Sequence, residues 1–134
     1  MTKEDIKYQA YIQILKEELI PAMGCTEPIA LAYAAAKARE VLGCIPERVH
    51  IGASGSIIKN VKSVIVPNTN HLKGIPAAAT AGIIAGDASK ELEVISDVTE
   101  AQTKETLRCI KQAGYDGIEL NGFMIRPTPF IVRM

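Results

Sequence analysis

The residue best placed to do chemistry in this sequence is Cys25, which lies in the run Gly24-Cys-Thr-Glu-Pro28. Thr26 is a typical N-cap, with Glu27 and Pro28 in the first turn, so we expect a helix to begin here. Unpaired N–H groups and the helix dipole favour a thiolate at this position, and a thiolate is both a nucleophile and a metal ligand. The alternative is a small buried side chain in front of a capped helix, with Glu27 only complementing the dipole.

The second candidate is the segment Ser54-Gly-Ser-Ile-Ile-Lys-Asn60, which joins an expected strand to an expected helix. Ser56 and the N–H groups that follow it could form an anion-binding nest, with Lys59 adding positive charge. A carboxylate would fit such a nest. The alternative is an ordinary N-cap and glycine turn. Gly52 and Gly55 are not part of a dinucleotide fingerprint, because the third glycine and the later acidic residue are missing.

His71 lies in a polar loop and could transfer protons, although a solvated loop histidine is the commoner case. If Cys25 and His71 met in space, they would form a nucleophile and base pair. Cys44 and Cys109 have the surroundings of packing cysteines, and His50 lies on an expected strand.

Five segments show the composition or period of helices, at residues 4–20, 26–43, 57–65, 74–85 and 97–114. Thr2 with Asp5, and Asp97 with Glu100, resemble capping pairs. The helix that ends at Gly43 is apolar on every side and should be largely buried. The segment 74–85 is so rich in alanine and glycine that we expect very close packing there.

Strand signals are few. Residues 48–53 alternate apolar and polar side chains, and the segment from Ile118 to Met134 has a β-like composition interrupted by Pro127 and Pro129. We therefore predict an α+β fold that is predominantly helical, with residues 1–134 forming a single compact domain. This domain contains a short strand-turn-helix unit and C-terminal edge-strand segments. The apolar run from Phe123 to Val132 needs a partner, so we expect a homo-oligomer formed through this tail, or a missing C-terminal half.

The charge balance, the apolar stretches and the cysteine count limit which partners and which location we expect. The 134 residues carry 15 basic and 15 acidic side chains, so no positive field is available for a nucleic acid. The longest uncharged apolar stretch, Ile75 to Gly86, is shorter than the roughly 20 residues that cross a bilayer. Charged residues near the start exclude the apolar core of a signal peptide, so we expect a cytoplasmic protein. The 3 cysteines fit neither a disulfide framework nor a common zinc spacing, and we expect free thiols.

Three motifs together resemble the iron-sulfur L-serine dehydratase alpha-chain superfamily, over residues 5 to about 115. They are Gly24 to Ala30, Ser54 to Asn60, and Gly74 with the alanines and glycine that follow it. The run from Gly24 to Pro28 looks most like the L-cysteine desulfidase branch. The resemblance implies a lyase without pyridoxal phosphate, which uses a [4Fe-4S] cluster to convert L-cysteine or L-serine, a small amino-acid substrate, to pyruvate and ammonia. By position, Cys25 would be a cluster ligand, and Ser54, Ser56, Lys59 and Asn60 would hold the substrate carboxylate.

The chain departs from this family in length, because the other cluster cysteines lie in a C-terminal region that it lacks. Cys44 and Cys109 do not match those positions, so one thiolate would have to hold the cluster, and the catalytic base is not assigned. We therefore expect an N-terminal fragment or subunit that is inactive alone. The alternative is a non-catalytic remnant or interaction domain that keeps the family fold.

Overall fold

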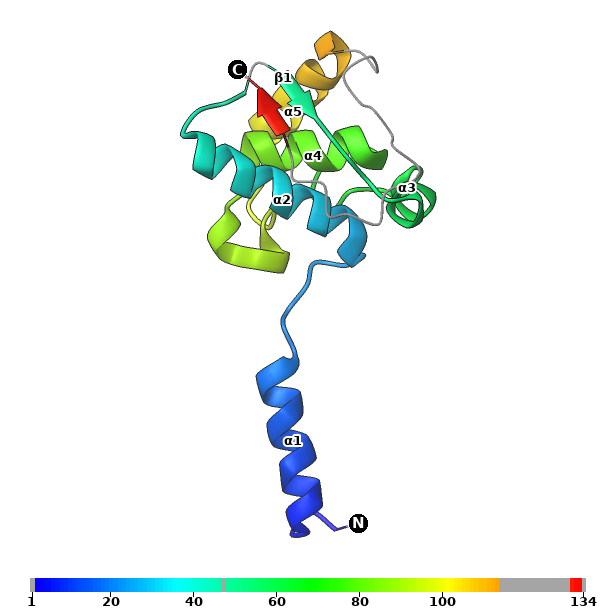
Figure 1. Cartoon of the computed structure of the whole chain (residues 1–134), viewed down its shortest axis with the longest axis vertical. Coiled ribbons are helices and arrows are strands. Elements are labelled where there is room, and N and C mark those ends of the chain that lie inside the picture. Colours follow the sequence, from blue (N-terminus) through cyan, green and yellow to red (C-terminus); the bar gives the residue numbers. More distant parts are fainter. Residues whose placement is uncertain (1, 47, 114–130, 134) are drawn as a thin grey trace.

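A computed structural model of the chain describes residues 2–46, 48–113 and 131–133, and these are mostly helical, with one short two-stranded sheet (Figure 1). The predominantly helical α+β fold is thus confirmed. The elements in chain order are α1 (Ile6–Glu18), α2 (Thr26–Leu42), β1 (Arg48–His50), α3 (Gly55–Val61), α4 (Gly74–Ala85), the 3-10 helix η1 (Ala88–Glu93), α5 (Glu100–Ala113) and β2 (Ile131–Arg133).

The core is built where α2 packs against α4 (Figure 1). A Cβ added at Gly82 of α4 would lie 2.1 Å from the carbonyl oxygen of Ala32 in α2, so the two backbones approach as closely as glycine and alanine allow. The predicted close packing of residues 74–85 is therefore confirmed. Only one side of α2 is buried, since Ala30 and Val41 are exposed, and the prediction that α2 is largely buried holds for that side alone.

Arg39 of α2 ties this helix to the end of α4. Its guanidinium donates hydrogen bonds to the carbonyl oxygens of Ile83, at 2.7 Å, and Gly86, at 2.6 Å. These are carbonyls that the end of a helix leaves without intrahelical donors. α2 itself ends as predicted at Gly43, whose left-handed backbone, with φ of 78°, suits glycine.

α5 packs against α4, and it begins with a capping box two residues after the expected pair. The Thr99 hydroxyl accepts from the Gln102 N–H at 3.2 Å, and the Gln102 side chain accepts from the Thr99 N–H at 2.9 Å. The expected cap of Asp97 with Glu100 is wrong, because the Thr99 hydroxyl and the Gln102 amide satisfy these two donors reciprocally. The 3-10 helix η1 was not expected from the sequence.

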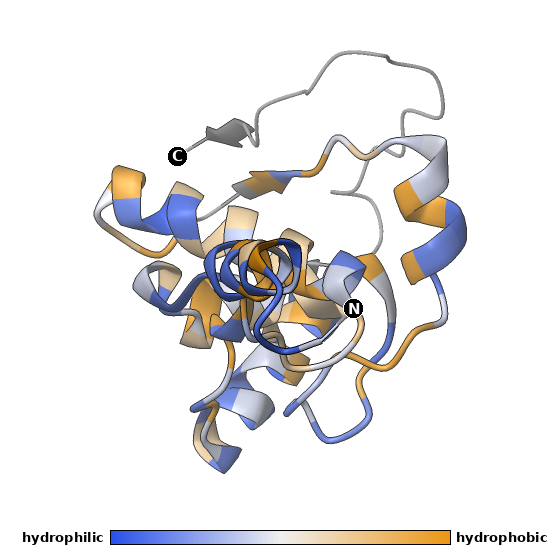
Figure 2. Cartoon of the chain, turned by 90° about the horizontal axis from the view of Figure 1, so that it is seen from below, coloured by the Kyte–Doolittle hydropathy of each residue, from blue (hydrophilic) through white to orange (hydrophobic). Residues whose placement is uncertain are grey.

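α1 extends away from the rest of the described chain (Figure 1) and buries none of its residues. It makes no contact with another named element of the described structure. Figure 2 looks along α1 and shows hydrophilic and hydrophobic residues on the same helix. The Leu15 side chain is half-exposed. Its N-cap is Asp5, which accepts from the Lys7 N–H at 2.9 Å, and not the expected Thr2.

β1 and β2 form an antiparallel pair in which Val49 lies opposite Val132. The strand expected at residues 48–53 is thus shorter than predicted. Most of the expected C-terminal edge-strand region lies outside the described residues. Its three described residues pair within the same chain, so no second copy is required at β1, and self-association through this tail stays a prediction.

The helix expected at residues 57–65 is shifted toward the N-terminus, because α3 ends at Val61 and Ile65 instead forms an isolated bridge with Lys73. Residues 67–73 form the polar loop in which His71 was expected to lie. None of the helices in the described parts of the chain has the length and apolar character that crossing a membrane requires.

Candidate functional site

Cys25 occupies the N-cap position of α2, where the sequence predicted Thr26. The Cys25 backbone is extended, and no side chain caps the first N–H groups of the helix. Its thiol is exposed, so the alternative of a buried packing cysteine does not hold. The thiol therefore lies next to a helix N-terminus with access to solvent, as expected of a reactive cysteine.

Glu27, in the first turn of α2, connects this thiol to α3. One carboxylate oxygen, Oε1, accepts a hydrogen bond from Nδ2 of Asn60 at 2.7 Å. The other, Oε2, lies 4.0 Å from Cys25 Sγ, the outer limit of a sulfur hydrogen bond. A thiol, a carboxylate and an amide thus follow one another across the junction of the two helices, and the two sequence motifs meet there.

The rest of the 54–60 segment presents polar side chains on the face of α3 that carries Asn60. Ser56 lies one turn before Asn60, so the two share a helix face, and Lys59 lies beside them. Within the described structure, neither the Ser56 hydroxyl nor the Lys59 ammonium has a hydrogen-bond or ion-pair partner. We call Cys25, Glu27, Ser56, Lys59 and Asn60 the α2–α3 cluster.

Ser54 has a structural role. It is the N-cap of α3, and its Oγ accepts from the Ile57 N–H at 3.3 Å. This is the capping role that the alternative interpretation gave it. Its hydroxyl proton can still be donated to a ligand, since the capping bond uses only the oxygen.

The α2–α3 cluster has the parts of an activated nucleophile: a thiol, a carboxylate that can accept its proton, and an amide that orients the carboxylate. His71 was the other candidate for the base. It is exposed, and no hydrogen bond joins its ring to Cys25 in the part of the chain that the structure describes. The group beside the thiol is Glu27.

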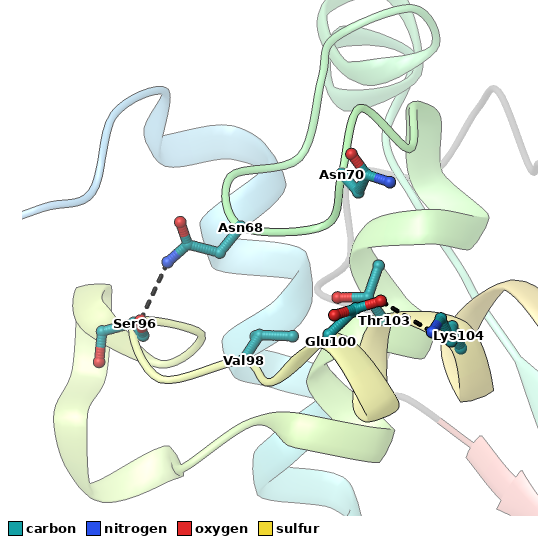
Figure 3. A pocket seen from close by; sticks show the side chains of 7 residues that line it. All are labelled: Asn68, Asn70, Ser96, Val98, Glu100, Thr103 and Lys104. Atoms are coloured by element: carbon teal, nitrogen blue, oxygen red, sulfur yellow. Dashed lines mark hydrogen bonds and ion pairs between the residues drawn. The ribbon is translucent and has the colours of Figure 1, made fainter.

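A second polar region lies in the loop at residues 67–73, where Asn68, Asn70 and His71 all have left-handed backbones. Such backbones are uncommon for residues other than glycine and cluster at functional sites. The loop faces the start of α5 across a cavity of about 540 Å³ (Figure 3). Sequence reasoning missed this region, and the only local signal was the asparagine-rich Pro67 to Asn70, since asparagine tolerates this conformation.

The described residues offer no ligand set for an iron-sulfur cluster. Among residues 2–46, 48–113 and 131–133, no three His, Cys, Asp or Glu side chains gather closely enough to hold a metal ion. Cys44 is exposed, and Cys109 is half-buried on α5. Burial and the nearby Glu105 carboxylate raise the pKa of the Cys109 thiol, which opposes the thiolate that a metal requires.

Comparison with known proteins gives the chain's relatives. It is 62% identical over 105 residues to a UPF0597 protein of Desulfitobacterium hafniense, covering 78% of this chain and 24% of that protein. A UPF0597 protein of Treponema denticola is 56% identical over 104 residues, covering 78% of this chain and 24% of the relative. A UPF0597 protein of Lachnoclostridium phytofermentans is 58% identical over 103 residues, covering 77% of this chain and 25% of that protein. No family model matches the chain, and no solved structure matches it.

These relatives correct the functional expectation from the sequence. Their names place them among UPF0597 proteins and not in the iron-sulfur L-serine dehydratase alpha-chain or L-cysteine desulfidase superfamily, so that assignment is wrong. The predicted function, a fragment or subunit of an iron-sulfur lyase, rested on that assignment and is also wrong. The relatives give no support to a non-catalytic remnant either. The chain spans about a quarter of the length of the curated relatives it matches, and over most of its own length it is similar to UPF0597 proteins.

Proposed function

We propose that the α2–α3 cluster binds a small molecule through a carboxylate group and presents it to the thiol of Cys25. The observation that carries this proposal is the hydrogen bond from Asn60 to Glu27, which brings the polar face of α3 to the start of α2. Without that contact, the thiol and the Ser56 and Lys59 side chains would be separate surface features.

The charges in the α2–α3 cluster favour a carboxylate near Lys59. Its ammonium has no acidic partner among the described residues, and a charge-assisted hydrogen bond to a carboxylate is stronger than one between neutral groups. Ser56 can donate a second hydrogen bond from the same helix face. Glu27 repels a carboxylate, so the ligand's anionic end should lie toward Lys59, with its other end toward Cys25. A small amino acid fits this polarity, since its ammonium group would face Glu27.

Protection of Cys25 from alkylation tests the proposal. Mass spectrometry of the Cys25 peptide would follow iodoacetamide labelling with acetate, propionate or lactate present, each compared with its neutral amide at constant ionic strength. We expect the carboxylates to slow labelling of Cys25 and the amides to leave it unchanged. Equal effects of an acid and its amide would contradict the proposal.

A pair of lysine variants provides the matched control. Lys59→Gln removes the proposed contact, whereas Lys62→Gln removes an exposed lysine from the next residues of the chain. We expect protection by the carboxylates to be lost in Lys59→Gln and kept in Lys62→Gln. Unchanged protection in Lys59→Gln would show that the carboxylate binds elsewhere.

We also propose a cytoplasmic location, which the free thiols of the three cysteines support. Fractionation of cells that express a tagged full chain would test it, with recovery from the membrane or the medium as the contradicting result.

A further inference from the structure

The cavity between the 67–73 loop and α5 has the dimensions of a small-molecule site. Its volume is about 540 Å³, within the range of ligand pockets. Six polar side chains and one apolar side chain line it (Figure 3): Asn68, Asn70, Ser96, Glu100, Thr103, Lys104 and Val98. It shares no lining residue with the α2–α3 cluster.

Hydrogen bonds hold the two walls of the cavity together. The Asn68 amide donates to the carbonyl oxygens of Ile95, at 3.1 Å, and Ser96, at 3.0 Å. These bonds fasten the loop to the segment before α5, and Figure 3 shows the one to Ser96. Thr69 is buried, and its hydroxyl donates to the Val66 carbonyl at 2.7 Å. The loop is therefore bonded to the neighbouring segment at Asn68 and to itself between Val66 and Thr69, and such an ordered loop lowers the cost of binding a ligand.

Several polar groups in the cavity remain available to donate hydrogen bonds to a ligand or to accept them from it. The Asn70 side chain forms no hydrogen bond with any residue that the structure describes. The Thr103 hydroxyl donates to the Thr99 carbonyl at 3.1 Å and keeps its lone pairs for a ligand. Glu100 and Lys104 form an ion pair at 2.7 Å that is open to solvent, so a ligand can reach both groups.

The charges of this pair determine the kind of ligand. A cation would be attracted by Glu100 and repelled by Lys104, and an anion would be attracted by Lys104 and repelled by Glu100. A charged ligand therefore gains little binding free energy from this pair. A hydroxyl group is donor and acceptor at once: it can donate to the Glu100 carboxylate and accept from the Lys104 ammonium. Val98 offers an apolar surface to the C–H face of a ring.

We propose that this cavity binds a neutral, hydroxyl-rich small molecule of the size of a monosaccharide or cyclic polyol. Neighbouring hydroxyls would bond to Glu100 and Lys104, and a further hydroxyl would bond to Asn70 or Thr103. The site is additional to the α2–α3 cluster and does not depend on it.

Titration of the ¹⁵N-labelled full chain with myo-inositol and with D-glucose tests the proposal. We expect saturable shifts of the backbone amides of Asn70, Ser96 and Thr103, with a Kd on the order of millimolar for at least one of the two. Glycine and sodium acetate are the charged comparisons, and neither should produce these shifts. A site that responds to glycine or acetate and to neither polyol would overturn the proposal.

Two glutamate variants on α5 form the matched control. Glu100→Gln changes a carboxylate that lines the cavity, and Glu105→Gln changes one that is paired with Arg108 outside it. We expect Glu100→Gln to weaken polyol binding about tenfold and Glu105→Gln to change it less than about twofold. No saturable shift with either polyol at about 100 mM, or equal binding by the two variants, would overturn the proposal.

Discussion

Asn60 of α3 donates a hydrogen bond of 2.7 Å to Glu27 of α2, and this contact joins residues 33 positions apart in the sequence. It holds the Glu27 carboxylate in the orientation that places its other oxygen beside the thiol of Cys25. The contact therefore joins two helices and orients the carboxylate next to the thiol, and a change at Asn60 should affect both stability and the thiol.

Asn60→Asp replaces the donor with a carboxylate that faces Glu27. We expect a loss of about 1 kcal/mol or more in the free energy of unfolding at pH 7, because two carboxylates then repel each other. Their mutual repulsion raises the pKa of the pair, so the loss should shrink as the pH falls and one of them takes up a proton. Urea unfolding at pH 7 and near pH 4.5 would measure both effects. Asn60→Ala removes the donor without adding charge, and an identical pH response in the two variants would contradict this explanation.

Cys109 should react with iodoacetamide more slowly than Cys25 at neutral pH, because Cys109 is half-buried and Cys25 is exposed. Burial, followed by the carboxylate of Glu105, raises the pKa of the Cys109 thiol, so its thiolate forms only at higher pH. Glu105→Gln removes that charge and should shift the pH profile of Cys109 labelling to lower pH. Glu100→Gln, on the first turn of the same helix, is the control, and an equal shift there would rule out a specific effect of Glu105.

Gly82→Ala should disrupt the core. In an exposed helix, replacing glycine with alanine stabilises by about 1 kcal/mol, but here the new Cβ would lie 2.1 Å from the Ala32 carbonyl oxygen. We expect a loss of about 3 kcal/mol or more, since one backbone must move away from the other. Thermal unfolding would measure it, with Ala30→Gly on the exposed side of α2 giving the size of a propensity effect alone. Any gain in melting temperature for Gly82→Ala would show that α2 and α4 are not in this close contact.

Leu15→Ala in α1 should change the free energy of unfolding by less than about 0.5 kcal/mol, because α1 buries no residue in the described structure. Ile29→Ala in α2 is the comparison, and we expect it to cost about 2–5 kcal/mol, since Ile29 is fully buried. Chemical unfolding of both variants would make the measurement. A loss above about 1 kcal/mol for Leu15→Ala would mean that something packs on α1, and sedimentation would then show whether it is a second copy of the chain.

Much of the fold could be predicted from the sequence because helix formation depends on nearby residues. The period of apolar side chains predicts α1 and α5, and the signals at Thr26 and Gly43 predict the two ends of α2. The exact caps were less predictable: Asp5, Cys25 and Thr99 occupy positions that Thr2, Thr26 and Asp97 could also have taken. Several polar residues near each helix start compete for the same N–H groups, and small differences in backbone geometry decide among them.

The sequence by itself determined which residues could do chemistry, the thiol of Cys25 and the polar segment 54–60, because residue type and a position at a helix start are local properties. Only the tertiary structure decided that the Glu27 carboxylate meets Asn60 on one side and the thiol on the other, and that Asn68 bonds to the segment before α5. These relationships join segments tens of residues apart. Which segments meet depends on how α2, α4 and α5 pack together, and no short stretch of sequence contains that information.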